Sequence, residues 1–343
     1  MLRLKSIWQY PKGENNDLLD GLTSQILDLK EFRDTVNDCS NYVIEALRLN
    51  NSGDHVLAFE QFNKLMDTTK LFINNHSEAV FFANKKDVFY RTKFFDSPAI
   101  QDQQRFFHTP YELNGKVSGT RFSFPGLAAL YLTNALIVGY QETNATNIDN
   151  FQGVKFKPNY PLSFLNIDFN NPRIHTKSTD PDLYDSQLQV KGLIYPLLLA
   201  CYTKQTDAHA VAPQEYVIPQ FLTLWVKRNI KLSQGIRYSS TKIIQPPFKG
   251  DFYNLVLPPI EIKDEGYCSE LKRYFSMSPV CSGSIHKLQY ENYFLTQYTP
   301  SVLINANVEI VEWNRNVLEY HETDIGKMEF YLKNNLPSAA IKF

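Results

Sequence analysis

Apolar residues recur at helical spacing in the N-terminal part of the chain. From Leu29 to Ala46 they return every three or four positions, the period of an amphipathic helix. The polar residues 50–54 end this pattern, and Ser52 or Asp54 is placed to cap a second helix. One face of the second helix carries Ala58, Phe62, Leu65, Thr69 and Phe72. We therefore predict a pair of helices joined by a short polar turn.

The pattern changes after residue 84, where short β-rich runs mix with helical stretches. The expected strands are Val88–Arg91, Leu127–Leu132, Leu162–Asp168, Gly235–Tyr238 and Asn254–Leu257, and the expected helices are 135–142, 192–202 and Tyr216–Lys227. Thr133 or Asn134 is placed to cap the helix at 135–142. Because no regular βαβ repeat is present, the pattern favours an α+β fold over a doubly wound sheet.

Composition excludes several classes of protein. The 343 residues include 35 Lys and Arg against 36 Asp and Glu, so the basic footprint of a dedicated nucleic-acid-binding protein is missing. The apolar stretch 126–140 contains polar residues, and 192–202 is about half the ~20 residues of a membrane-spanning helix. We expect no membrane insertion and no secretory leader. The 24 Phe, 20 Tyr and 3 Trp could fill a core or line a cleft.

Cysteines, histidines and glycines give no catalytic motif. Cys39, Cys201, Cys268 and Cys281 lack C-x-x-C spacing and are typical of reduced, structural thiols in a cytoplasmic protein. The seven histidines never stand at ligand spacing with a second His or Cys, so we expect no metal site. Phosphate-binding P-loop and Rossmann motifs and the G-x-S-x-G elbow do not occur.

An ordered set of motifs runs through the middle of the chain. It consists of Arg91, Arg121-Phe122-Ser123 with Gly126, Leu130-Tyr131-Leu132, Glu142, and Gly235-Ile236-Arg237-Tyr238-Ser239-Ser240. Each motif is weak alone, but the order resembles that of the RES domain family, which is named for its Arg, Glu and Ser. The resemblance covers roughly residues 88–290 and is to the longer members, which carry extra residues at both ends. The chain departs from the pattern at Ala128-Ala129, where a Pro is common, and at Pro219, where shorter members have Thr.

The resemblance implies an α+β fold similar to that of ADP-ribosyltransferases, with a central mixed or antiparallel sheet flanked by helices. We accordingly divide the chain into a lead-in segment, an N-terminal helical hairpin module for packing or oligomerisation, a RES-like catalytic domain and a C-terminal extension. The predicted boundaries are 1–23, 24–84, 85–290 and 291–343.

The same resemblance implies an enzyme that consumes NAD as its substrate and needs no further cofactor. Members act as toxins that split the nicotinamide–ribose bond by hydrolysis or phosphorolysis, and they are usually paired with a helix-turn-helix antitoxin. Two alternatives stay open, an ADP-ribosyltransferase that modifies a protein and a non-catalytic nucleotide-binding interaction protein. A homo-oligomer and the identity of any antitoxin also stay open.

The residue types in the motifs suit this chemistry. Cleavage of the N-glycosidic bond passes through an oxocarbenium-like state, whose positive charge a carboxylate at Glu142 would stabilise. Tyr131 offers a ring for nicotinamide, and the guanidinium groups of Arg91 and Arg121 can hold a pyrophosphate through paired hydrogen bonds. The assigned catalytic residues are Glu142, Arg121 and Tyr131, and the assigned substrate-binding residues are Arg91, Ser240, Ser123 and Tyr238.

Taken singly, each of these residues has a plainer structural interpretation. An arginine on a strand is usually a salt-bridge partner, and a carboxylate at a helix end is usually solvated. Arg237 is expected to be an exposed strand residue. His108 is expected to be a hydrogen-bonded structural histidine, with a substrate contact as the alternative. The order of the motifs is what favours the functional interpretation.

Overall fold

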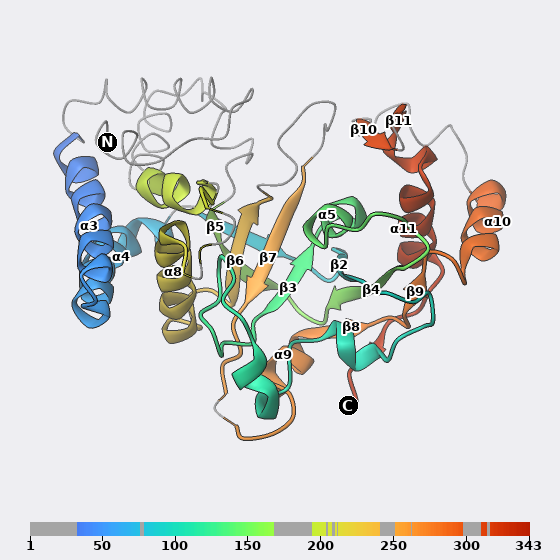
Figure 1. Cartoon of the computed structure of the whole chain (residues 1–343), viewed down its shortest axis with the longest axis horizontal. Coiled ribbons are helices and arrows are strands. Elements are labelled where there is room, and N and C mark those ends of the chain that lie inside the picture. Colours follow the sequence, from blue (N-terminus) through green and yellow to red (C-terminus); the bar gives the residue numbers. More distant parts are fainter. Residues whose placement is uncertain are drawn as a thin grey trace. The chain divides into compact units, whose positions relative to one another are not determined.

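The chain folds into two compact units, and each is assembled from three separate segments. Unit 1 takes residues 1–82, 114–127 and 163–241, and unit 2 takes residues 83–113, 128–162 and 242–343. The computed structural model describes residues 33–75, 79–167, 194–203, 205–207, 210, 212–240, 251–261, 263–297, 310–313 and 316–343 (Figure 1).

The described part of unit 1 starts with the predicted helical pair, α3 (Arg33–Asn51) and α4 (His55–Asn75). Asp54 is the cap of α4, because its carboxylate accepts a hydrogen bond from the Leu57 backbone N–H at 3.1 Å. The predicted apolar face of α4 is fully buried at Ala58, Phe62, Leu65 and Thr69, while the Phe72 side chain lies outside the described part of the chain. The helical period therefore predicted both helices correctly.

The rest of unit 1 places helices against a small group of strands. Strands β5 (Leu162–Ile167) and β6 (Gly235–Ser239) pair in parallel, and β1 (Val80–Ala83) neighbours β5. Helix α8 (Val217–Arg228) follows the short 3-10 helix Gln214–Tyr216 and packs on the helical pair, with the Phe221 ring 5.3 Å from that of Phe59. Residues 194–202 form the predicted buried helix.

Unit 2 is built on an antiparallel sheet. Its strands follow one another in the order β7 (Tyr253–Leu257), β3 (Leu130–Thr133), β2 (Phe89–Phe94), β4 (Phe151–Pro158), β8 (Phe275–Met277) and β12 (Ala339–Ala340), and β9 (Cys281–Ser282) also pairs with β4. The parallel pair of unit 1, the antiparallel sheet of unit 2 and the flanking helices confirm the predicted α+β class.

Unit 2 also contains helices, 3-10 helices and a separate β-hairpin. They are the 3-10 helices Gln103–Phe106 and Tyr320–Glu322, the hairpin of β10 (Ile310–Trp313) and β11 (Asn316–Glu319), and helices α5 (Leu136–Glu142), α9 (Ser269–Tyr274), α10 (Lys287–Gln297) and α11 (Asp324–Asn334). A further 3-10 helix, Tyr111–Lys116, runs across the boundary between the segments of the two units. No helix in the described ranges combines the length and the apolar character needed to cross a membrane.

The C-terminal residues supply much of the core of unit 2. Helices α5 and α11, green and red in Figure 1, pack together with residues of α10 and the strands. Fully buried members of this cluster include Leu136, Ile137, Phe151, Tyr290, Ile325, Met328 and Leu332. Residues of the 3-10 helix Tyr320–Glu322 and of α11 are therefore part of the core that supports α5.

The predicted cap of α5 is wrong. The N-cap position is Ala135, which has no side chain able to accept a hydrogen bond. The Thr133 hydroxyl instead donates to the backbone oxygen of Ala135, and the Asn134 side chain accepts from the Tyr253 backbone N–H on β7. These two hydrogen bonds hold the backbone just before the helix. They leave the first backbone N–H groups of α5 without a capping side chain, so these groups need another acceptor.

Gly139 allows α5 to lie directly on β2. A Cβ atom at this position would sit 2.7 Å from Cγ2 of Thr92, well inside van der Waals contact. We expect Gly139→Ala to lower the free energy of unfolding by about 1–3 kcal/mol, because the methyl group must displace the helix or the strand side chain. Urea denaturation measures the change. Because the clash is with Thr92, Thr92→Ala should recover part of this loss in the double variant, and strictly additive losses would contradict the contact.

Candidate functional site

The predicted site residues fall into two groups, one in each unit. Unit 2 holds Arg91, Tyr131 and Glu142, and unit 1 holds Arg121, Ser123, Tyr238 and Ser240.

Arg91 and Tyr131 meet on neighbouring strands of unit 2. Strands β2 and β3 are antiparallel, with Tyr90 opposite Thr133. The Arg91 guanidinium donates to the backbone oxygen of Tyr131 at 3.1 Å and lies 5.9 Å from the centre of its ring. Both side chains are half-buried. The backbone bond orients the guanidinium beside an aromatic ring, an arrangement that suits an anionic ligand with a flat group.

Glu142 is the last residue of α5 and is held over the same sheet. Its Oε1 accepts a hydrogen bond from the side-chain amide of Asn254 at 2.9 Å. Asn254 is buried on β7, which pairs with β3 and sets Asn254 opposite Thr133. The carboxylate is therefore oriented by a buried amide from a strand adjacent to that of Tyr131.

Lys93 adds a second positive charge to β2. It stands two residues after Arg91, so both side chains leave the same face of the strand. Burial, followed by the charges of Arg91 and Arg105, lowers the pKa of Lys93 to about 8. Arg105 itself is in the 3-10 helix Gln103–Phe106 and lies over the Phe95 ring. This face of β2 therefore favours an anion, whose charge would relieve the repulsion among the three cations.

In unit 1, Arg121 closes the end of a helix. Its guanidinium donates to the backbone oxygens of Cys201 at 3.2 Å and Thr203 at 2.5 Å, where the helix 194–202 ends, and it lies 5.2 Å from the centre of the Tyr216 ring. Burial alone would raise the pKa of the nearby Glu215, but hydrogen bonds, among them those from Thr206, and the charge of Arg121 lower it below its usual value. The observed contacts of Arg121 are structural, and they leave its assigned catalytic role a prediction.

The Arg121-Phe122-Ser123 motif forms a tight loop held by α8. The backbones of Thr120 and Ser123 bond to each other, and the Gln220 side-chain amide donates to both of their carbonyl oxygens, at 2.9 and 3.2 Å. The Phe122 ring packs 4.2 Å from that of Tyr238 on β6. Ser240 follows β6 and is buried. The ring contact places the loop beside β6.

Two further expectations have different outcomes. Arg237 was expected to be exposed but is only 4% exposed, because the Phe81 ring covers its guanidinium at 4.8 Å. His108 is the expected structural histidine: its Nε2 accepts from the Cys268 backbone N–H at 2.8 Å, and its Nδ1 lies 2.7 Å from the Thr109 oxygen. Burial lowers the pKa of His108 to about 4, so the ring is neutral at physiological pH.

The four cysteines are buried free thiols.

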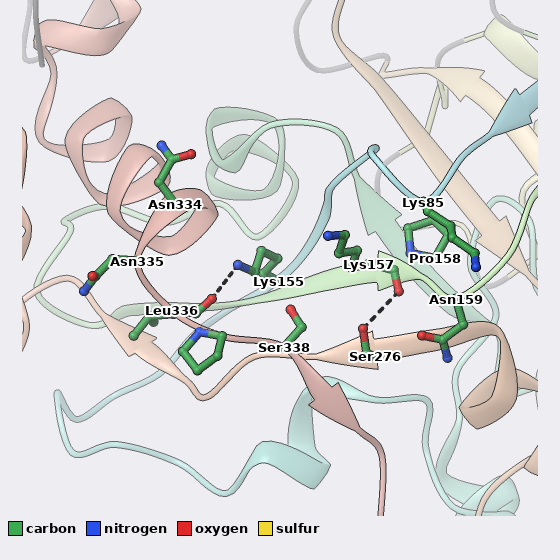
Figure 2. Close-up of a pocket in the computed structure, with 11 residues that line it drawn as sticks. Lys85, Lys155, Lys157, Pro158, Asn159, Ser276, Asn334, Asn335, Leu336 and Ser338 are labelled. Carbon is green, nitrogen blue, oxygen red and sulfur yellow. Dashed lines mark hydrogen bonds between the residues drawn. The ribbon is translucent and has the colours of Figure 1, made fainter. Parts of the chain in front are cut away.

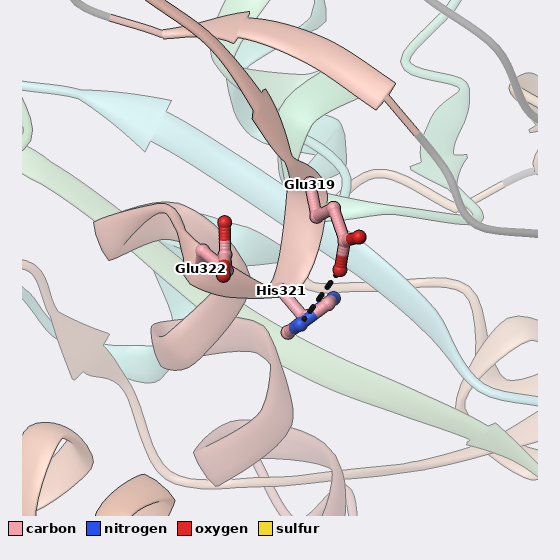
Figure 3. A group of neighbouring side chains, drawn as sticks. All are labelled: Glu319, His321 and Glu322. Carbon is pink, nitrogen blue, oxygen red and sulfur yellow. Dashed lines mark ion pairs between the residues drawn. The ribbon is translucent and has the colours of Figure 1, made fainter. Parts of the chain in front are cut away.

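One group of side chains in the described part of the chain has the composition of a metal site. Glu319, His321 and Glu322 offer ligand atoms that all lie within 4.8 Å of one another (Figure 3). The dashed line in Figure 3 is the contact of 3.2 Å between His321 Nε2 and the Glu319 carboxylate. Glu319 is the last residue of β11, and His321 and Glu322 belong to the 3-10 helix that follows it. None of them belongs to the predicted motifs, and the ion pair explains the closest contact.

Sequence reasoning missed Asn254, Lys93 and Gln220. Lys93 had a readable signal, because a cation two positions after Arg91 on a strand must share its face. Gln220 lay within the Tyr216–Gln220 segment that precedes the Gly-Ile strand, but nothing in that segment indicated a loop contact. The role of Asn254, a polar residue in an apolar strand, becomes visible only from the pairing of β7 with β3.

Comparisons with known proteins give one relative. A Bacillus subtilis (strain 168) protein named "Putative toxin YopC" is 25% identical to this chain over 299 residues. The matched region is 80% of this chain and 63% of the relative, so the chain spans less than two thirds of the relative's length. No protein-family model matches the chain. No solved structure matches it either. The resemblance to the RES domain family therefore stays a prediction.

Proposed function

We propose that the chain is a toxin-type enzyme that cleaves the nicotinamide–ribose bond of NAD. Glu142 would stabilise the positive charge that develops on the ribose as nicotinamide leaves. Arg91 and Lys93 would bind the pyrophosphate, and Tyr131 would pack against a flat ring of the substrate. Nicotinamide carries a positive charge while bonded to the ribose and leaves as a neutral ring, so the step requires no metal.

The observation that carries this proposal is the orientation of Glu142 by Asn254. The two strands that carry Tyr131 and Asn254 are hydrogen-bonded neighbours, and the carboxylate at the end of α5 is bonded to the second of them. A carboxylate that is held in place before the reaction can stabilise a developing positive charge without reorganising. The name of the Bacillus subtilis relative supports a toxin-type role.

Incubation of the purified full chain with NAD tests the proposal. Release of nicotinamide, followed by chromatography, is the expected result, and the remaining product identifies the acceptor. Free ADP-ribose indicates water, and a phosphorylated ADP-ribose indicates phosphate. Radiolabel that stays on a protein band indicates transfer to a side chain. NAD that binds without any release of nicotinamide would contradict the proposal and favour a nucleotide-binding interaction protein.

The affinity for NAD should fall as the pH rises. Lys93 is charged below its pKa of about 8 and neutral above it, so an anionic pyrophosphate loses one partner between pH 7 and 9. We expect the Kd measured by calorimetry to increase about tenfold over this interval. The Lys93→Arg variant keeps its charge at both pH values, so its Kd should change much less. An equal pH dependence in the variant would remove Lys93 from the binding site.

A further inference from the structure

A cavity in unit 2 has the composition of an anion site. It has a volume of about 620 Å³, within the range of roughly 300–1,000 Å³ typical of pockets for small molecules. Three lysines line it, Lys85, Lys155 and Lys157, and its lining contains no Asp or Glu. None of the residues of the candidate functional site takes part. We refer to this cavity as the lysine pocket.

The positive charges in the lysine pocket are not neutralised by the protein. Among the described residues, none of the three lysines forms an ion pair. Lys155 donates to the backbone oxygens of Lys333 and Leu336 and so fixes the segment that follows α11 (Figure 2). Burial, followed by the charge of Lys157, lowers the pKa of Lys155. Lys85 and Lys157 are exposed and remain available to a ligand.

Neutral hydrogen-bonding groups complete the pocket. The side-chain amides of Asn159, Asn334 and Asn335 line it together with the hydroxyls of Ser276 and Ser338. The Ser338 Oγ is buried without a hydrogen-bond partner, and in Figure 2 it lies between Lys155 and Lys157. A buried hydroxyl with no partner is costly unless a ligand supplies one.

We propose that the lysine pocket binds the phosphate group of a small phosphorylated metabolite. Lys157 and Lys85 supply charge-assisted hydrogen bonds to a phosphate, and the Ser338 hydroxyl donates a further one after rotation about its Cα–Cβ bond. No aromatic ring lines the pocket, so the carrier of the phosphate is a polar, hydroxylated group such as a sugar. A single-stranded nucleic acid is disfavoured because its binding sites combine a long basic groove with stacking rings.

Calorimetric titration of the full chain with ribose 5-phosphate, inorganic phosphate and ribose tests this site. Binding of ribose 5-phosphate and no binding of ribose are expected. Tighter binding of ribose 5-phosphate than of phosphate identifies a sugar phosphate as the ligand, and equal binding identifies free phosphate. Lys157→Gln should weaken binding about tenfold, and the affinity of the wild-type protein should fall with added salt.

Two variants separate the pocket from general charge effects. Lys64→Gln removes one exposed lysine from α4 in unit 1 and should leave the affinity for ribose 5-phosphate unchanged. Ser338→Ala leaves the charge unchanged and should weaken binding several-fold, because the hydroxyl then cannot donate. No loss of affinity in either Lys157→Gln or Ser338→Ala would overturn the assignment. Binding of an acidic peptide or of oligothymidylate, but not of ribose 5-phosphate, would overturn it as well.

Discussion

Replacing Glu142 with Gln is expected to lower the rate of nicotinamide release by about 10²–10³-fold. Gln keeps an oxygen that can accept the hydrogen bond from Asn254, so the end of α5 stays in place while the negative charge is lost. The loss of charge acts on the transition state more than on bound NAD, so kcat should fall while the Kd for NAD changes little. Steady-state kinetics combined with calorimetry measure both quantities.

A control variant must show that the loss of any one carboxylate does not lower the activity. Glu60 is an exposed carboxylate on α4, and Glu60→Gln should leave both kcat and the melting temperature unchanged. Glu142→Ala should lower kcat as Glu142→Gln does, with the fold intact by circular dichroism. Full activity in the Glu142→Gln or Glu142→Ala protein would exclude Glu142 from the mechanism.

Replacing Glu329 with Ala should lower the free energy of unfolding by about 2–4 kcal/mol. Glu329 on α11 supplies the acceptor that α5 lacks at its N-terminus: its Oε2 accepts from the Leu136 backbone N–H and from the Tyr320 hydroxyl, both at 2.5 Å. Burial and the charge of Glu329 raise the pKa of the Tyr90 hydroxyl far above its usual value. Removal of the carboxylate leaves these buried donors without an acceptor.

Denaturant titration of the Glu329 variants measures this effect. Glu329→Gln retains an acceptor of the same shape and should recover more than half of the loss, while Glu322→Ala at an exposed position of the same region should be neutral. Because Glu329 and Glu142 act on opposite ends of α5, Glu329→Ala should also lower the activity assigned to Glu142. A Glu329→Ala protein as stable as the wild type would show that α5 does not depend on this carboxylate.

The elements that were predicted have apolar residues that repeat over several turns or stand in continuous runs. Helices α9 and α10 and strands β1, β8, β9 and β12 were not predicted, because they are short or their apolar pattern is weak. Strand β4 was not predicted, although it lies inside the sheet of unit 2. Its sequence contains Gln152 and Lys155, which read as solvent-facing, yet both are buried. Gln152 bonds to the backbone of Gln101 and Ala99, and Lys155 donates to the backbone oxygen of Lys333 in the last turn of α11. Partners that are 51 and 178 residues away cannot be read from local pattern.

In the candidate site, too, the residues could be chosen from sequence motifs, but their orientations depend on contacts with distant segments. The motifs assigned Arg91 and Tyr131 to one site, and the pairing of β2 with β3 accounts for the contact between them. The orientation of Glu142 could not be predicted, because it depends on a single amide of β7. Arg237 was expected to be an exposed strand residue, but an aromatic ring from β1 covers it. Such coverage is set by the packing of distant segments.

The division of unit 2 into three segments has a consequence for how the protein is made. Glu142 belongs to its second segment, while Asn254 and Glu329, which hold the two ends of α5, belong to its last. A ribosome that has translated Glu142 must add more than a hundred further residues before Asn254 is made, and Glu329 follows later still. Abandoned or clipped chains that lack the last third therefore carry an unoriented carboxylate. Both ends of α5 can therefore be held only after the ribosome has passed Glu329.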